Sequence, residues 1–196
     1  MIFKRMKAVT ADPVLGRKVL KLIENQIAVY TLHTNLDSGI GGLNDFLGEE
    51  LLGLKKGKIL DSLEYNGEEY GIGRVYKLLI PQNIFEFSSE IKEKLHLKDV
   101  VLTPYSDDMV LKKIAIVTGS GSSYWRKAKK MGADILITGD IKYHEAVDAK
   151  EENFVLMDIG HFESEWIFVK LLTKLLENEF SLDIIYFNDG PIFKRI

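Results

Sequence analysis

Residues 113–140, KIAIVTGSGSSYWRKAKKMGADILITGD, contain the pattern that decides the fold. Two short apolar runs, 113–118 and 135–138, are typical of buried strands. Between them lie a turn rich in glycine and serine and a helical stretch over 124–131. A connection of this kind joins parallel strands through a crossover helix. The segment therefore predicts a βαβ unit of an α/β protein.

The same alternation continues on both sides of this unit. We expect helices over 12–25, 84–95, 140–149 and 162–179 and after Gly41-Gly42, and strands over 27–32, 74–80, 100–103, 154–158 and 184–187. Asn66-Gly67 is a turn signal that closes a hairpin within 58–70. Strands that alternate with helices imply a largely parallel sheet covered by helices on both faces. Since no linker or repeat interrupts the 196 residues, the sequence predicts a single α/β domain over 1–196.

The composition excludes several classes of site. The chain has no cysteine, which removes disulfides, thiolate zinc sites, iron–sulfur clusters and cysteine nucleophiles. Its net charge is −3 and its basic residues are interspersed with acidic ones, so no nucleic-acid-binding stripe is indicated, although a local patch stays open. No apolar run approaches the roughly 18 residues of a membrane span and no signal peptide is recognisable, so we expect no membrane partner and a cytoplasmic location. Any metal must therefore be held by His, Asp, Glu and water.

The segment GHFESE, residues 160–165, places a histidine and two glutamates just after the end of the predicted strand 154–158. His161 and Glu165 are four residues apart, so at the start of a helix they project from one face, where an imidazole and a carboxylate can share a cation. The carboxyl edge of the sheet is also where α/β proteins bind ligands. By spacing alone, a simple surface pair or a carboxylate that interacts with the helix dipole stays an alternative.

His33 and Asp37 are a second pair with four-residue spacing, after the predicted strand 27–32. Taken singly, Asp37 is equally well a helix cap and His33 a core imidazole. Because two such pairs follow two predicted strands, coincidence is less attractive as an explanation. The two pairs, His33 with Asp37 and His161 with Glu165, are therefore candidates for a site that binds a divalent metal.

Two other strand ends carry polar residues. Asp140 is expected to cap the helix that follows the strand 135–138. His144, one turn later, is a candidate for orienting a ligand or transferring a proton. The turn 119–123 is either an anion site, because its glycines expose backbone amides, or a tight structural turn.

These segments together resemble the Ngg-interacting-factor-three-like family, whose members are also called GTP cyclohydrolase I type 2 homologs, over essentially the whole chain. The matching strings are YTLHTNLD (30–37), GIGR (71–74), GSG (119–121), TGDIKYH (138–144) and GHFESE (160–165). The resemblance implies an α/β fold that assembles into a toroidal homohexamer, with a dinuclear metal centre facing the interior cavity.

The resemblance also implies roles for individual residues. Asp37, His161 and Glu165 would be ligands of zinc, manganese or iron, with Glu165 as a bridge, and His33 and His144 would line the site as proton-transfer partners. The implied function is a metal-dependent hydrolase with metal-activated water and a small-molecule substrate, for which a nucleotide is a candidate. The alternative is a non-catalytic metal-binding scaffold that binds a protein partner or nucleic acid.

One departure from the family pattern concerns the start of the chain. The family begins with a strand ending in His-His-Pro that supplies two further ligands, and residues 2–4 resemble the end of that segment. The chain is therefore expected to lack about 60 leading residues, about two βαβ units, and it has no room for the family's inserted middle domain. Three remaining ligands predict weaker or mononuclear metal binding. A bared sheet edge predicts self-association.

Overall fold

The computed structural model describes residues 8–12, 14–188 and 190–193, which divide into two compact units, Met1–His33 and Thr34–Ile196. The first unit contains helix α1 (Val14–Glu24), whose apolar residues recur at helical spacing as predicted. Pro13, the expected first helical residue, lies outside the described residues. None of the helices in the described part of the chain is long and apolar enough to cross a bilayer.

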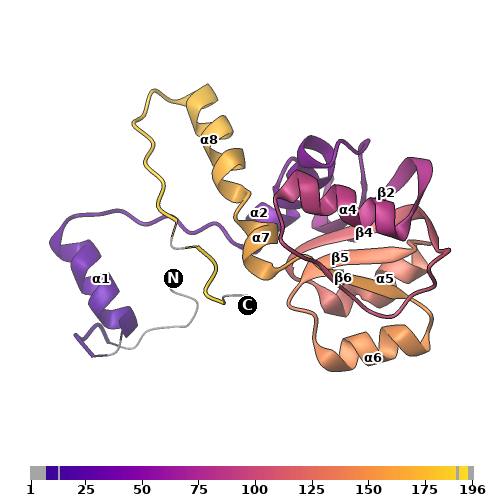
Figure 1. Ribbon diagram of the computed structural model, residues 1–196. Coiled ribbons are helices and arrows are strands. Elements are labelled where there is room, and N and C mark those ends of the chain that lie inside the picture. Colours follow the sequence, from indigo (N-terminus) through magenta and orange to yellow (C-terminus); the bar gives the residue numbers. More distant parts are fainter. Residues whose placement is uncertain (1–7, 13, 189, 194–196) are drawn as a thin grey trace. The chain divides into compact units, whose positions relative to one another are not determined.

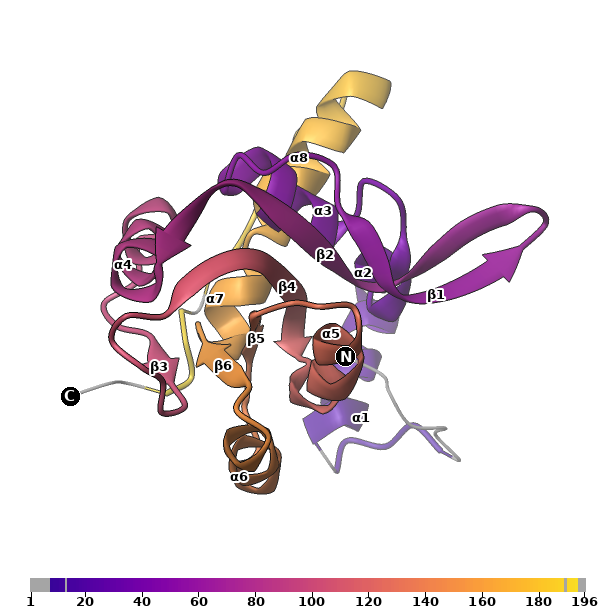
Figure 2. The same ribbon diagram turned by 90° about the vertical axis from the view of Figure 1, so that its right-hand side faces the viewer.

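The second unit is built on a six-stranded sheet in the order β1-β2-β4-β5-β6-β3 (Figures 1 and 2). Its strands are β1 (Lys58–Tyr65), β2 (Glu68–Asn83), β3 (Val101–Leu102), β4 (Val110–Ser120), β5 (Ile135–Gly139) and β6 (Val155–Asp158). Of the five described strand pairs, β4–β5 and β5–β6 are parallel, whereas β1–β2, β2–β4 and β3–β6 are antiparallel.

The prediction of a largely parallel sheet is therefore wrong, because the sheet is mixed. The physical reason lies partly in the hairpin at Asn66-Gly67, since a two-residue turn joins antiparallel strands only. β2 then continues through the single run Glu68–Asn83 and pairs antiparallel with β4 as well. The parallel part is confined to the βαβ segments of β4, β5 and β6.

Helices cover both faces of this sheet. The helices of the second unit are α2 (Thr34–Ser38), α3 (Leu43–Asp45), the π-helix η1 (Phe46–Leu51), α4 (Ile84–Leu95), the 3-10 helix η2 (Ser122–Tyr124), α5 (Trp125–Lys130), α6 (Tyr143–Glu151), α7 (His161–Glu165) and α8 (Phe168–Glu179). Figure 1 shows α4 and α6 on opposite sides of the central strands. The helix predicted over 162–179 is thus divided into α7 and α8.

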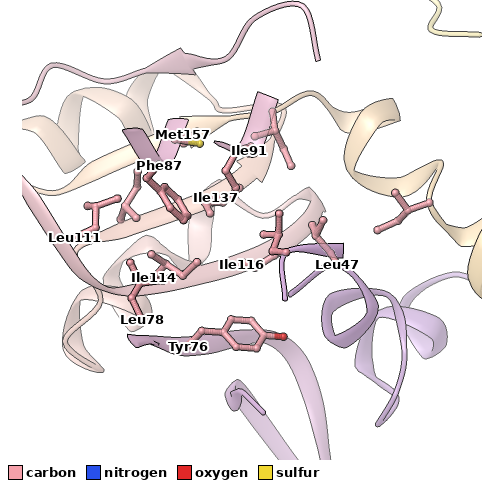
Figure 3. Packing of buried hydrophobic residues seen from close by; sticks show 14 of the residues in the cluster. Leu47, Tyr76, Leu78, Phe87, Ile91, Leu111, Ile114, Ile116, Ile137 and Met157 are labelled. Atoms are coloured by element: carbon pink, nitrogen blue, oxygen red, sulfur yellow. The ribbon is translucent and has the colours of Figure 1, made fainter. Parts of the chain in front are cut away.

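Alternate residues of the central strands point to opposite faces and build two apolar clusters. Ile114 and Ile116 of β4 belong to the cluster beneath α4, which is shown in Figure 3 with Phe87 and Ile91. Ala115, next to them in the sequence, belongs to the other cluster, beneath α5 and α6. Because both faces are packed with apolar side chains, polar chemistry is left to the ends of the strands.

The strands predicted over 27–32 and 184–187 are wrong. Both segments lack regular structure, and Tyr30 and Ile185 are 85% and 93% exposed. A strand needs a neighbour that completes its backbone hydrogen bonds, and neither segment pairs with any of the described strands. An apolar run without such a neighbour does not become a strand.

Candidate metal site

The site lies where β4, β5 and β6 end. Gly119 and Gly139, near the ends of β4 and β5, allow α7 to approach closely. A Cβ added to Gly139 would lie 2.6 Å from the backbone nitrogen of His161, and one added to Gly119 would clash with the carboxylate of Glu165. Glycine at these two positions therefore lets α7 pack directly on the strand ends.

A buried serine fastens α7 in this place. Ser164 is fully buried, and its hydroxyl accepts a 2.9 Å hydrogen bond from the amide of Gly119 and donates one to the carbonyl of His161. The same side chain thus joins the end of β4 to the first turn of α7. His161 and Glu165 are positioned by this contact as well as by the glycines.

The ring of His161 lies between two carboxylates. Its Nδ1 is 2.6 Å from Oδ2 of Asp140, and its Nε2 is 3.3 Å from Oε2 of Glu165. A carboxylate on one ring nitrogen fixes the ring and leaves the other nitrogen for a cation, as is usual for histidines that bind metals. The predicted pairing of His161 with Glu165 is therefore present in the structure as a direct contact.

The protonation of His161 reflects opposing influences. Burial by itself lowers the pKa of the imidazole, but the hydrogen bond to Asp140 and the charge of Glu165 raise it, and the net result is a raised pKa. The two carboxylates therefore stabilise a positive charge at this position, whether on the imidazolium or on a bound cation.

The expectation that Asp140 caps the next helix is wrong. The N-cap of α6 is Lys142, which makes no side-chain capping bond. Asp140 has a positive φ of 49°, uncommon for a residue other than glycine, and its carboxylate bonds to His161. This left-handed turn directs the side chain to α7 instead of α6. The position of Asp140 directly after a strand was the sequence signal for a site residue, but its partner is 21 residues away.

Asp37 lies at the end of α2 and contacts the same strand end. Its carboxylate accepts a long hydrogen bond, 3.4 Å, from the hydroxyl of Thr118, and Thr118 precedes Gly119, the residue against Glu165. The structure thus brings Asp37 to the end of β4, although 81 positions separate it from Thr118 in the sequence.

An imidazole nitrogen and carboxylate oxygens are suitable ligand atoms for zinc, manganese or iron. His161 and Glu165 also fit such an ion in their mutual placement. Within the described ranges, however, no three His, Asp or Glu side chains are grouped closely enough to hold a cation. Asp37 as the third ligand therefore stays a prediction.

The two proton-transfer candidates come from other segments of the chain. His33 ends the first unit, whereas His161 and Glu165 belong to the second. His144 is exposed on α6, and its ring packs edge-on against that of Tyr143 with centroids 6.0 Å apart. Roles for both histidines stay predictions.

Two backbone amides of the turn 119–123 donate hydrogen bonds to buried side chains of the fold. The amide of Gly119 donates to Ser164, and the amide of Gly121 donates to the hydroxyl of Thr138 at 2.8 Å. These contacts favour the tight structural turn over the anion site.

Known proteins resemble this chain in sequence. A family model described as Duf34/NIF3 (NGG1p interacting factor 3) matches residues 1–190. A protein of Clostridium perfringens (strain 13 / Type A) named GTP cyclohydrolase 1 type 2 homolog is 44% identical over 180 residues, which cover 90% of this chain and 67% of that protein. A Clostridium acetobutylicum protein of the same name is 37% identical over 177 residues, which cover 90% of this chain and 65% of that protein. The chain thus spans about two thirds of the length of these curated relatives.

Solved structures agree with the fold. The crystal structure of Staphylococcus aureus protein SA1388 superposes with a TM-score of 0.85 at 27% identity, covering 100% of this chain and 78% of that one. A Bacillus cereus protein related to NIF3 gives a TM-score of 0.80 at 21% identity, covering 98% of this chain and 80% of that one. At the lower identity the likeness concerns the fold alone.

Proposed function

The chain belongs to the Duf34/NIF3 family, and on this premise we propose that it is a metal-dependent hydrolase-like protein, a homolog of GTP cyclohydrolase 1 type 2. The observation that carries the proposal is the placement of the His161 ring between Asp140 and Glu165 at the strand ends. This arrangement presents a ring nitrogen and a carboxylate to a shared cation, while Asp140 holds the ring in place.

In this proposal His161 and Glu165 hold a divalent ion of zinc, manganese or iron, with Asp37 as the third ligand. When bound, such an ion lowers the pKa of a coordinated water and polarises the substrate. Asp140 orients the imidazole. His33 and His144 are proposed to transfer protons. The substrate is a small molecule, with a nucleotide as the candidate suggested by the relatives' name, and we expect the protein to act in the cytoplasm.

A second candidate function, a non-catalytic metal-binding scaffold, is favoured by the location of the cavity. A cavity of about 740 Å³ is lined by Phe162, Glu163 and Trp166, together with residues of the α4 end, and neither His161 nor Glu165 contributes to it. The side chains of His161 and Glu165 are instead partly exposed, at 43% and 39%. Hydrolases usually enclose the reacting groups, so an open site suits a scaffold that displays its metal to a partner or nucleic acid.

The experiment compares Glu165→Gln with Glu163→Gln. Both glutamates lie on α7, but the carboxylate of Glu163 lies against Gly160 instead of His161. Titration calorimetry with Zn²⁺ and Mn²⁺ should show an affinity lowered at least about 10-fold for E165Q, as is typical when a site loses an important group. E163Q should bind like the unchanged chain, and Asp37→Ala should weaken binding if Asp37 is a ligand.

Hydrolysis of nucleoside triphosphates, with and without these ions, then separates the two functions. Metal-dependent turnover that E165Q and D37A abolish supports the hydrolase, whereas metal binding without turnover supports the scaffold. Unchanged metal affinity in E165Q would contradict the proposal that Glu165 is a metal ligand. Two tightly bound equivalents per chain would contradict the expected single weak site.

A further inference from the structure

Asn44 is a buried polar residue of α3 that connects two parts of the candidate site. We infer that Asn44 is a positioning residue, which sets the place of Asp37 relative to the end of β4 and so completes the metal site. The inference rests on the proposed function in so far as Asp37 is a ligand. The side-chain hydrogen bonds of Asn44 go to Asp37 and Thr118.

Both ends of the Asn44 side chain are engaged. The side chain is 1% exposed, its Nδ2 donates to the backbone carbonyl of Asp37 at 3.0 Å, and its Oδ1 accepts from the amide of Thr118 at 3.0 Å. A primary amide donates through its nitrogen and accepts through its oxygen, so this side chain can bridge two backbone groups at the same time. Asn44 therefore ties α2, which carries Asp37, to β4.

The segment between Asp37 and Asn44 is clamped independently. Arg74, which is 2% exposed, donates through Nη2 to the carbonyl of Gly39 at 3.0 Å and to Oδ2 of Asp45 at 2.8 Å. The same carboxylate oxygen accepts from the amide of Gly41 at 2.8 Å. The loop at Gly39 and Gly41 is thus held without the Asn44 side chain, so loss of this side chain should affect α2, which carries Asp37, and not the loop.

Thr118, the strand residue bonded to Asn44, is next in the chain to Gly119, which lies against Glu165. Thr118 donates its amide to Oδ1 of Asn44 and its hydroxyl to the carboxylate of Asp37. The next residue, Gly119, lies against Glu165 and donates its amide to Ser164. Loss of Asn44 should therefore move Asp37, while His161 and Glu165 keep their own attachment through Ser164.

The test compares Asn44→Ala with Thr103→Ala in the full chain. Thr103 is also buried, at 8% exposure, and its hydroxyl accepts from a strand amide, that of Leu156, at 2.9 Å. Each variant therefore leaves one buried strand amide without its acceptor, but Thr103 contacts no group of the candidate site in the described structure. Thermal unfolding shows how far each change destabilises the fold.

Two readouts distinguish positioning from a merely structural role. Hydrogen exchange without metal should be faster at residues 34–38, the residues of α2, in N44A and unchanged there in T103A. Titration with Co²⁺ and Zn²⁺ should show an affinity roughly 10- to 100-fold lower in N44A, with altered Co²⁺ d–d bands, as is typical for groups that orient ligands. T103A should bind these ions like the unchanged chain.

Each other outcome is decisive. Unchanged exchange at 34–38 in N44A overturns the inference, as does a metal affinity equal to that of T103A at similar stability. If the unchanged chain binds neither ion, the proposed function fails, and the exchange data still decide whether Asn44 holds the Asp37 segment. Should N44A not fold, Asn44→Ser gives the same comparison, because a serine hydroxyl cannot span both partners.

Discussion

Tyr76 combines packing and a polar contact in one buried side chain. It is 1% exposed, and its hydroxyl donates to the carbonyl of Asn44 at 3.1 Å. Its ring fills the space next to two glycines, since a Cβ on Gly57 would lie 2.7 Å from the ring and one on Gly48 would collide with the phenol. Burial, and then the charge of Asp45, raises the pKa of Tyr76 well above its ordinary value.

We predict that Tyr76 makes the fold sensitive to alkaline pH. A tyrosine with a raised folded pKa contributes stability that is complete below the unfolded pKa of about 10 and is lost as pH rises toward the folded value. Tyr76→Phe should remove this component and, at neutral pH, cost about 0.5–1.5 kcal/mol through the lost hydrogen bond. Urea unfolding between about pH 8 and 11 measures both effects.

The control for this prediction is Tyr65→Phe. Tyr65 is 67% exposed at the end of β1, so its replacement should leave the pH dependence unchanged. If the Y76F and Y65F variants lose stability with pH at the same rate as the unchanged chain, the predicted role of Tyr76 is refuted.

The β1–β2 hairpin shows how local backbone preference acts at the level of an element. Asn66 and Gly67 both have positive φ, 53° and 78°, as the type I′ turn requires, and the register pairs Tyr65 with Glu68. Since β1 is an edge strand that pairs with β2 alone among the described strands, this turn anchors it together with the pairing to β2.

Gly67→Ala should loosen this hairpin. A Cβ at Gly67 would meet nothing within 4 Å, so the cost is conformational and not steric. A residue with a Cβ in the left-handed region costs about 1–2 kcal/mol, and we expect a loss of unfolding free energy of that size with faster hydrogen exchange in β1. Asn66→Gly, which satisfies the same φ, is the control and should keep β1 protected. Unaltered stability in G67A would show that the turn does not anchor the strand.

Several large apolar side chains outside the two clusters are exposed across the molecule. Ile185, Phe187 and Ile192 in the C-terminal segment are 93%, 81% and 93% exposed, and Tyr30 in the first unit is 85% exposed. Covering an apolar side chain of this size contributes about 1.5–3 kcal/mol. Exposed apolar side chains of this size favour self-association, and the homohexamer stays a prediction.

We predict concentration-dependent self-association. Sedimentation velocity over rising protein concentration should show species larger than the 22.3 kDa chain. Ile185→Lys combined with Phe187→Lys should shift the distribution toward the monomer, whereas Glu152→Lys, at the exposed C-cap of α6, should not. A monomer at every concentration would contradict both the association and the hexamer.

What the sequence by itself determined is local. Helix α4 occupies the predicted residues 84–95, and the hairpin turns at Asn66-Gly67 as predicted, because side-chain periodicity and turn chemistry act between near neighbours. The four-residue spacing of His161 and Glu165 likewise predicted that both side chains project from one face of a helix start, and in α7 they are 3.3 Å apart. The family, too, followed from short strings in their order.

What only the tertiary structure decided depends on partners far away in the sequence. The direction of the β2–β4 pairing made the sheet mixed, and the apolar runs at 27–32 and 184–187 stayed without a strand neighbour. Asp140 bonds to His161 and does not cap the following helix. Asn44 accepts a hydrogen bond from Thr118, which is 74 residues away in the sequence. A backbone hydrogen bond or a carboxylate is satisfied by whichever group the fold brings near, and that group cannot be read from local spacing.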